Sequence, residues 1–328
     1  MSIYLNKKKS IDVICAGILV YDIALPPIDS LPKAGELINV ERPKHLIGGS
    51  AANTAIALAK LGKKVAAIGF VGEDYLGKKI IENLRNTDVI VDNILTSGFL
   101  ETSQSIHVLV NGEDRRFIHY FGANSEFRVD HLKASMENCD FKSNPKIIVI
   151  GGFLLLPGFN ASELNNFLKQ LKNQNFTIVL DVAFDKNQIN LKEDLVSVLK
   201  NVDYFLPNFD EACILTNSQN PEIQAKTLIQ WGAKAVVITC GEKGSFFMTD
   251  NHCLKLGIYE VDIKDGSGAG DAFTAGFVYG LQESWDIIDC LKFASVLAAS
   301  VCREVGCTTS LFSKQEAIEK MSQIRVLS

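Results

Sequence analysis

The segment "DGSGAGDAF" (Asp265 to Phe273) combines closely spaced glycines with a carboxylate, directly before a predicted helix. Its glycines stand at every second position, which lets successive backbone N–H groups converge. The helix that we expect to begin near Ala269 adds the positive end of its dipole, so the segment could stabilise an anion. Asp271 could take a proton beside that anion, or it could simply be a first-turn acid that satisfies the helix start.

A second polar pattern, "NFDE" (Asn208 to Glu211), places an amide and a carboxylate three residues apart at another predicted helix start. Taken alone, this spacing is typical of a capping box, in which the two side chains satisfy backbone N–H groups. The familiar nucleotide fingerprints are absent, because the sequence has no G-x-x-x-x-G-K-[ST] and its first strand is not followed by G-x-G-x-x-G. A Rossmann dehydrogenase is therefore not expected.

The composition is that of an ordinary globular protein that acts on a small molecule. Of the 328 residues, 47% are hydrophobic and 22% are charged, and the formal net charge is −5. No basic field attracts nucleic acid or an anionic membrane, and the longest apolar run is too short to cross a bilayer. The eight cysteines are scattered without a C-x-x-C pair, which favours reduced thiols and a cytoplasmic location.

Short apolar runs alternate with segments of helical periodicity along most of the chain. This alternation predicts one α/β domain over residues 1–328, with a mainly parallel sheet and helices on both faces. The expected strands span residues 11–17, 64–72, 145–152, 176–182, 202–208 and 234–241, and the expected helices span 50–62, 74–86, 161–174 and 191–201.

Two segments break the alternation, about residues 17–46 and 98–125. The first is an extended, proline-bearing insertion, and the second contains "SIHVLVNGEDRRFIHYF", which alternates along two arms around Asn111-Gly112. An Asn-Gly pair between alternating arms is a strong hairpin signal. We therefore predict a small β-sheet that stands off the main sheet as a lid, with His107 and His119 belonging to it.

Four motifs, in order along the chain, resemble the signatures of the PfkB carbohydrate kinase family, whose members have the ribokinase-like fold. The resemblance covers nearly the whole chain. It departs from the family pattern at Gly266, where Thr is usual, and at Cys240, where an apolar residue is usual. The motifs are "GGSAANTAIALAKLG" (48–62), "NFDE" (208–211), "VVITCGEKGSFF" (236–247) and "DGSGAGDAFTAGF" (265–277).

The resemblance implies ATP-dependent phosphorylation of a primary hydroxyl of a sugar or sugar-like substrate. It makes Asp271 the general base, and it makes the backbone N–H groups of Gly268, Ala269 and Gly270 the anion hole for the transferred phosphoryl group. A nucleoside kinase of the adenosine type is the alternative within the fold. A non-catalytic sugar or nucleotide sensor is a more remote alternative, against which the intact Asp271 and its glycines argue.

The resemblance also implies cofactor sites. Asn208 and Glu211 would hold Mg²⁺ through water near the phosphates of ATP, and the capping-box role of the same residues is compatible with this. Asp265 and Ser267 match positions that many members use around a monovalent cation such as K⁺, together with the loop "REVGCTTS" (303–310). The ATP site would be lined by Asn208, Thr239, Gly241 and Gly244.

On the substrate side, the resemblance implies that Gly48 and Gly49 bring backbone close to the sugar, while Asp22 and Asn53 bind its hydroxyls. Asp22 could also be only a loop acid on a lid strand. Arg115 and Arg116 could meet an acidic or phosphorylated substrate, although charges just past a hairpin turn more often form a solvated face. A homodimer through the lid is expected because relatives often form one.

Overall fold

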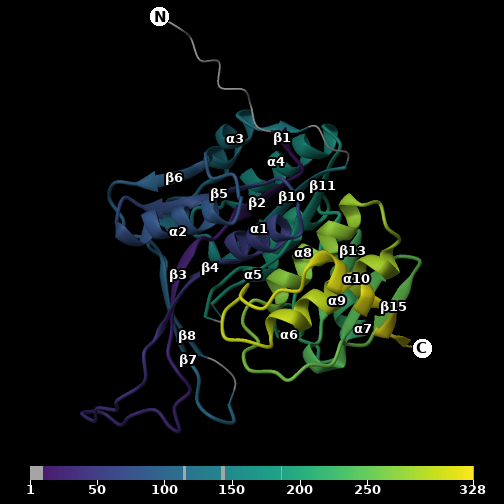
Figure 1. Ribbon diagram of the computed structural model, residues 1–328. Coiled ribbons are helices and arrows are strands. Elements are labelled where there is room, and N and C mark those ends of the chain that lie inside the picture. The colour runs from purple at the N-terminus through teal and green to yellow at the C-terminus, as the bar shows by residue number, and fades with distance from the viewer. Residues whose placement is uncertain (1–9, 114–115, 142–144, 186, 328) are drawn as a thin grey trace, which may run out of the picture.

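The computed structural model describes residues 10–113, 116–141, 145–185 and 187–327, and a large twisted sheet organises them (Figure 1). From β13 to β6 the neighbouring strands of this sheet run parallel, whereas β13 to β16 are antiparallel. Within the described residues its ten strands, in order across the sheet, are β16 (Val326–Leu327), β15 (Cys253–Leu256), β14 (Ser245–Thr249), β13 (Ala235–Thr239), β12 (Tyr204–Phe205), β11 (Phe176–Leu180), β10 (Lys146–Gly151), β2 (Val13–Gly17), β5 (Val65–Gly72) and β6 (Ile94–Ser97).

Helices cover both faces of the large sheet, as the alternation predicted. Alternate side chains of β2 point to opposite faces, so Val13 and Cys15 join one apolar core while Ile14 and Ala16 join the other. The first core includes residues of α1 (Ser50–Lys60), α2 (Tyr75–Asn86), α8 (Ala269–Gln282), α9 (Ile287–Val301) and α10 (Lys314–Lys320). The second includes residues of α3 (Val129–Glu137), α4 (Ala161–Asn173), α5 (Leu191–Leu199), α6 (Phe209–Thr216) and α7 (Pro221–Gln230).

The antiparallel edge of the large sheet was not part of the predicted alternation. β13 and β14 are joined by a single short 3₁₀ turn, Gly241–Lys243, rather than by an α-helix. Tight turns of this kind can join only antiparallel strands, because parallel neighbours need a long crossover. A separate pair, β1 (Ser10–Ile11) with β9 (Asp140–Phe141), adds a short parallel contact near the beginning of the described chain.

A second sheet stands off the large one, at the lower left of Figure 1. We call it the lid sheet; its strands, in order across the sheet, are β4 (Lys44–Gly48), β3 (Val20–Ala24), β7 (Gln104–Val108) and β8 (Arg116–Tyr120). The predicted hairpin is β7 and β8, which pair antiparallel from Gln104–Tyr120 to Val108–Arg116. Both predicted segments therefore contribute strands to one sheet, with β3 and β7 running parallel at its centre.

Asp74 links the start of α2 to the segment that leads into β7 of the lid sheet. Its carboxylate caps α2 by accepting the Gly77 N–H at 2.8 Å, and it accepts the Thr102 N–H at 2.6 Å and the Thr102 hydroxyl at 2.7 Å. Burial alone would raise the pKa of Asp74, but these hydrogen bonds favour the charged form and lower the pKa below its usual value. The residues before β7 are thereby anchored to α2.

Two further features concern the cysteines and the helices. All eight cysteines are free thiols, and three of them, Cys15, Cys290 and Cys307, are buried. Among the helices that the structure describes, none combines the length and apolar character needed to span a membrane.

Candidate active site

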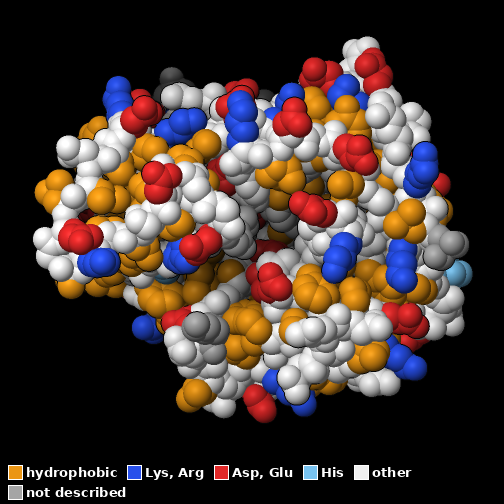
Figure 2. Space-filling view, turned by 90° about the horizontal axis from the view of Figure 1, so that it is seen from below, with side chains coloured by type: hydrophobic (Ala, Val, Ile, Leu, Met, Phe, Trp, Pro, Cys, Tyr) orange, Lys and Arg blue, Asp and Glu red, His pale blue; other side chains and the backbone are white. Residues whose placement is uncertain are grey.

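Predicted site residues from three distant parts of the chain meet at one cavity of about 240 Å³. Figure 2 shows the molecule from below, where its surface is hollowed near the centre and acidic side chains lie at the hollow. The cavity lies at the start of α8, beside the beginning of α6 and the end of β13. The predicted residues that line it are Asn208, Glu211, Thr239, Gly268, Gly270 and Asp271.

Asp271 lies in the first turn of α8 and is held from α1. The Asn53 side-chain amide donates to Asp271 Oδ2 at 2.8 Å, and the Thr54 hydroxyl lies 3.5 Å from the Asp271 carbonyl oxygen. Asn53 was predicted to contact sugar hydroxyls, but its donor is directed at the carboxylate instead. Its Oδ1 atom is buried and has no hydrogen-bond partner among the described residues, so this oxygen remains available to a ligand.

Gly268 begins α8 in a left-handed conformation, with φ of 78°. A side chain here would be strained, and its Cβ would lie 2.4 Å from the Cβ of Cys307. The 303–310 loop thus packs directly behind the predicted anion hole. The first amides of a helix have no intrahelical acceptor, although the Ala269 N–H lies 3.3 Å from the Gly266 carbonyl oxygen and so is already partly engaged.

Asp265 joins the two segments that were predicted to surround a monovalent cation. One carboxylate oxygen accepts the Ser267 N–H at 2.9 Å, and the other accepts the Gly306 N–H at 3.3 Å. Ser267 is buried. Asp265 therefore connects the glycine-rich segment to the 303–310 loop through its backbone, in agreement with the predicted proximity of the two segments.

Asn208 and Glu211 form a reciprocal cap at the start of α6. Asn208 Oδ1 accepts the Glu211 N–H at 2.8 Å, and Glu211 Oε2 accepts the Asn208 N–H at 2.8 Å. The Asn208 amide nitrogen and the second Glu211 carboxylate oxygen are not used in this cap, and both side chains line the cavity. Burial, reinforced by the negative charge of Asp271, raises the pKa of Glu211 to about 7, although its bond to the Asn208 backbone acts in the opposite direction.

Asp181 is a cavity residue that the sequence reasoning missed. It directly follows β11, and its side chain lies 3.3 Å from the Gly152 backbone N–H as the acceptor. Burial raises the pKa of Asp181 well above its usual range, and the nearby Glu211 and Asp271 charges add to this. A polar residue after a buried strand would have been the signal, because ligands bind at the carboxyl ends of parallel strands.

The charge of the cavity favours a bound cation. Asp181, Glu211 and Asp271 all line it, while no Lys or Arg is found among its described lining residues. Three carboxylates in one partly buried space repel each other unless a cation or protons compensate. No three His, Cys, Asp or Glu side chains of the described residues converge on one metal position. Mg²⁺ takes few protein ligands and keeps several waters, so the oxygens of Asn208 and Glu211 still fit the predicted metal.

Asp22 lies in the lid sheet and is almost completely buried, with 4% exposure. Its Oδ1 is 3.3 Å from His107 Nε2, and its Oδ2 lies over Gly48. A Cβ on Gly48 would come within 1.8 Å of Oδ2, so only glycine leaves room for this carboxylate. Gly49 follows as the residue that caps α1. The predicted substrate residues therefore lie together at the junction of lid sheet and α1.

Other predicted residues lie apart from this cavity. Gly241 and Gly244 belong to the turn after β13 and do not line it. Arg116 is exposed, points to the face of β8 opposite His119, and pairs with Glu113. This agrees with the solvated interpretation of Arg116, whereas Arg115 lies outside the described residues.

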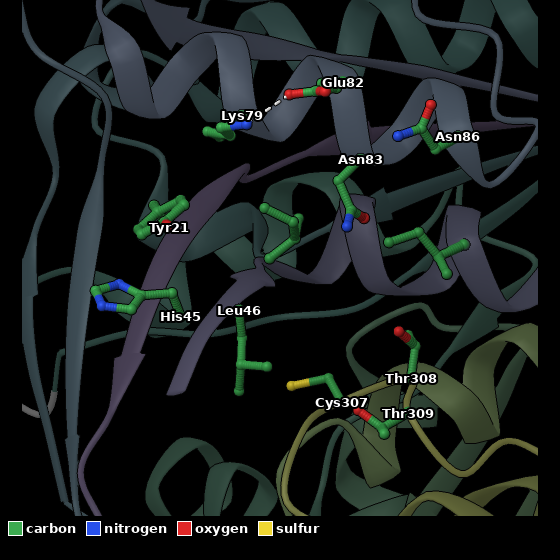
Figure 3. Close-up of a pocket in the computed structure, with 12 residues that line it drawn as sticks. Tyr21, His45, Leu46, Lys79, Glu82, Asn83, Asn86, Cys307, Thr308 and Thr309 are labelled. Carbon is green, nitrogen blue, oxygen red and sulfur yellow. Dashed lines mark hydrogen bonds and ion pairs between the residues drawn. The ribbon is translucent and has the colours of Figure 1, made fainter. Parts of the chain in front are cut away.

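A larger cavity of about 400 Å³ lies elsewhere, between α2, the strands β3 and β4, and the 303–310 loop (Figure 3). Tyr21, His45 and Asn83 contribute to its wall, together with the ion pair of Lys79 and Glu82. Of the predicted site segments, only the 303–310 loop reaches it, through Cys307, Thr308 and Thr309. We place the chemistry in the smaller cavity, because the carboxylates and the glycine-rich helix start converge there.

The two sheets and their arrangement define a ribokinase-like α/β fold. Ribokinase from Arabidopsis thaliana, solved with ribose and ATP, superposes with a TM-score of 0.79 at 24% identity, over 95% of this chain and 99% of that one. A fructokinase from Vibrio cholerae, solved with fructose, ADP and potassium, gives a TM-score of 0.76 at 20% identity, over 96% and 100%. These likenesses concern the fold.

The sequence comparison identifies the family. The model of the pfkB family carbohydrate kinases matches residues 10–314, and the chain belongs to this family. A 5-dehydro-2-deoxygluconokinase from Clostridium botulinum is 28% identical over 292 residues, covering 84% of each chain. The protein is thus a carbohydrate kinase that uses ATP and transfers a phosphoryl group to an alcohol.

Proposed function

We propose that this kinase phosphorylates a primary hydroxyl of a sugar, with Asp271 as the general base. The observation that carries the proposal is the position of Asp271 at the N-terminus of α8, inside a cavity shared with Asn208 and Glu211. Asp271 accepts the proton of the hydroxyl while its oxygen attacks the γ-phosphorus of ATP. The bond between this phosphorus and the bridging oxygen breaks, and ADP leaves with the electron pair.

Asn53 orients the base for this step. Its amide donates to Asp271 Oδ2, which fixes the orientation of the carboxylate at the start of α8. A base fixed by a neighbouring donor loses little entropy when the substrate binds. Asn53 therefore acts as a positioning residue, and its buried Oδ1 adds a place for a second sugar hydroxyl.

The start of α8 supplies the anion hole in this proposal. The amides of Gly268, Ala269 and Gly270 stabilise the negative charge on the transferred phosphoryl group, and the helix dipole acts in the same direction. The contact between the Ala269 N–H and the Gly266 carbonyl leaves Gly268 and Gly270 as the principal donors. A monovalent cation held near Asp265 and Ser267 would keep this loop in place.

Asn208 and Glu211 hold Mg²⁺ through water in this proposal, with Asp181 as an additional carboxylate on the same cavity. Mg²⁺ would neutralise phosphate charge when bound. Thr239 lies beside Asn208 through a parallel backbone bridge, which supports assigning the end of β13 to the nucleotide side. Gly241 and Gly244, in the turn that follows, complete the proposed ATP site.

The exposed surface of the lid sheet supports a dimer of this chain. Ile118 is 65% exposed, Tyr120 is 46% exposed and Ile106 is 38% exposed, and the pairing of β7 with β8 puts these three side chains on one face of the sheet. Apolar side chains gathered in this way favour burial against a partner. Sedimentation of the wild type beside Ile118→Lys tests the dimer, which the variant should dissociate. The free thiols support a cytoplasmic location.

A coupled assay of ADP release tests the proposed function. The candidates are ribose, fructose, 2-keto-3-deoxygluconate, 5-dehydro-2-deoxygluconate and adenosine, each with ATP and Mg²⁺. We expect turnover with a sugar. A preference for adenosine would establish the nucleoside kinase instead. Binding of a sugar without any ADP release would support the sensor.

A further inference from the structure

Two histidines stand on the same face of the lid sheet as Asp22. Asp22 pairs across the sheet with Ser105, and Ser105 pairs with His119 on the next strand, so these three side chains form one row. His107, two residues from Ser105 along β7, shares this face and contacts Asp22 Oδ1 at 3.3 Å. The carboxylate predicted to bind the sugar is therefore flanked by two imidazoles.

The ring of His119 is fixed on two sides. Its Nδ1 lies 2.8 Å from the Ser105 hydroxyl, and its ring meets Phe121 edge-on with centroids 5.1 Å apart. Among the described residues, the Ser105 side chain makes this hydrogen bond and no other. When the hydroxyl donates to Nδ1, the proton of the neutral ring resides on Nε2, which becomes a donor.

His119 Nε2 is buried and has no hydrogen-bond partner among the described residues. A buried polar atom without a partner is unfavourable, and in native proteins it usually marks a missing ligand or water. Five side-chain atoms of the described chain share this condition, and two others, Ser50 Oγ and Asn53 Oδ1, lie in α1 beside Asp271. Three of the five atoms thus lie on α1 and the lid sheet, the elements that carry the predicted substrate residues.

We propose that His119 binds the sugar, its Nε2–H donating a hydrogen bond to an uncharged oxygen, and that the site selects sugars without a carboxylate. The inference rests on the proposed function, because it assigns a contact to the same substrate. Asp22 accepts hydrogen bonds from sugar hydroxyls through Oδ2, while His119 donates. A ring or carbonyl oxygen, which can only accept, matches His119.

A carboxylate close to His119 disfavours an acid. Asp22 is the charged group that acts on the His119 ring, and it lies in the same row of side chains across the lid sheet. Burial lowers the pKa of His119, although the charge of Asp22 opposes this, so the imidazole is neutral rather than a counter-ion. His107 is already engaged by Asp22. A sugar carboxylate would therefore meet like charge.

Two variants and a control test the contact. His119→Phe keeps the ring but removes the donor, so we expect the sugar KM to rise about tenfold with kcat and the KM for ATP nearly unchanged. His119→Gln restores a donor and should recover part of this loss. His252→Phe, at an exposed histidine between β14 and β15, is the matched control and should behave as the wild type.

Calorimetric titration of ribose and fructose without ATP separates this inference from the kinase assignment. A tenfold weaker Kd in His119→Phe supports the contact even if no sugar is turned over, whereas absent turnover with normal binding overturns only the proposed function. An unchanged Kd, equal losses in both variants, or no binding of either sugar by the wild type overturns the contact. A higher kcat/KM for 5-dehydro-2-deoxygluconate than for the neutral sugars overturns the selectivity.

Discussion

Asp271, beside the large sheet, and Asp22, in the lid sheet, are held in place by different kinds of surroundings. Every residue of β2 and β5 is buried, and both faces of the large sheet are covered by helices. The lid sheet buries only a small apolar cluster of its own, Ile28, Val108 and Val110. Asp271 is therefore fixed by a rigid core, whereas Asp22 depends on local partners such as His107 and on the space above Gly48.

This difference suggests that the large sheet supports catalysis, whereas the lid sheet supports recognition of the sugar. Residues placed by a packed core can keep the precise geometry that proton transfer needs. Residues on a thin sheet can change with little cost to the fold, which suits the recognition of different sugars. We therefore expect changes near Asp271 to alter kcat and changes near Asp22 to alter KM for the sugar.

Asp271→Asn tests the rigid side of the comparison and should have the largest effect. The amide keeps the shape but cannot accept the proton, so kcat should fall by about 10²-fold or more. ATP binding, measured by calorimetry, should stay within a factor of about two, because the glycine-rich backbone is unchanged. Near-normal turnover would refute the assignment of the base.

Asp22→Ala tests the lid side. Loss of hydrogen bonds to a charged group should cost roughly 1.5 to 3 kcal/mol, or about 10- to 150-fold in the sugar's kcat/KM. The loss should disappear for deoxy analogues that lack the contacted hydroxyls. An equal loss with every analogue would mean that Asp22 only supports the structure of the lid sheet.

Gly48→Ala probes the same carboxylate without removing it. The added Cβ would lie 1.8 Å from Asp22 Oδ2, so the carboxylate must move. We expect a rise of about tenfold in the sugar KM, comparable to the loss of one good hydrogen bond. Gly98→Ala, where an added Cβ would meet only Glu73 Oε2, at 3.9 Å, controls for the loss of a glycine; if both variants behave alike, the close approach is unimportant.

Glu211→Gln should weaken the response to Mg²⁺ more than the affinity for the sugar. Residues that hold a metal through water typically change its affinity by about 10- to 100-fold, and we expect the lower end of this range. Titrations of Mg²⁺ and of sugar in one assay provide the comparison. A higher sugar KM with an unchanged Mg²⁺ requirement would show that the cap of α6 has no role in metal binding.

Replacing K⁺ by Na⁺ should reduce the rate by a smaller factor, about two- to fivefold, because the cation acts only by ordering the loop behind Gly268. Gly266, in place of the usual Thr, makes this segment more flexible and so more dependent on an ion. Rates in K⁺, Na⁺ and a bulky organic cation supply the measurement. Equal rates in all three would remove the cation from the proposed site.

Asp74→Ala should lower the free energy of unfolding without changing kcat or the KM for the sugar. The lost cap should cost about 1 to 2 kcal/mol in urea denaturation. The pKa of Asp74 is depressed in the fold, so its contribution is fully present above about pH 4 and is lost only as the pH falls through the folded value. The difference between wild type and variant should therefore be constant from pH 6 to 8.

The sequence predicted much of the fold because its periodicities are strong. Runs of buried β-branched residues and helical repeats indicated the parallel sheet and its two helical layers, and the Asn111-Gly112 pair indicated the β7–β8 hairpin. The antiparallel edge from β13 to β16 was missed. The turn after β13, taken by itself, indicates only that a strand ends there. Whether the next strand runs parallel or antiparallel depends on which strand it pairs with, and the local sequence pattern does not specify this.

The sequence indicated some residues of the candidate site and missed others, because only some of them belong to motifs that are local in the chain. Asp271, Asn208 and Glu211 stand in motifs whose spacing is visible in the chain. Asp181 is a lone carboxylate after a strand, and its meaning appears only when β11 and β12 bring it beside the others. Likewise, the need of His119 for a partner depends on burial and on cross-strand register, which no single segment specifies.

The pairing of β3 with β7 has a consequence for the order of folding. These strands are adjacent and parallel in the lid sheet, but α1, β5, α2 and β6 lie between them in the sequence. Contacts between such distant segments form late, because the entropy of closing the intervening loop must be overcome first. The parallel core must close a longer loop still, because β2 pairs with β10. All four lid strands end before residue 121, whereas Asn208, Thr239 and Asp271 follow much later, so a chain emerging from the ribosome would hold every strand that surrounds Asp22 before the residues of the nucleotide side are made.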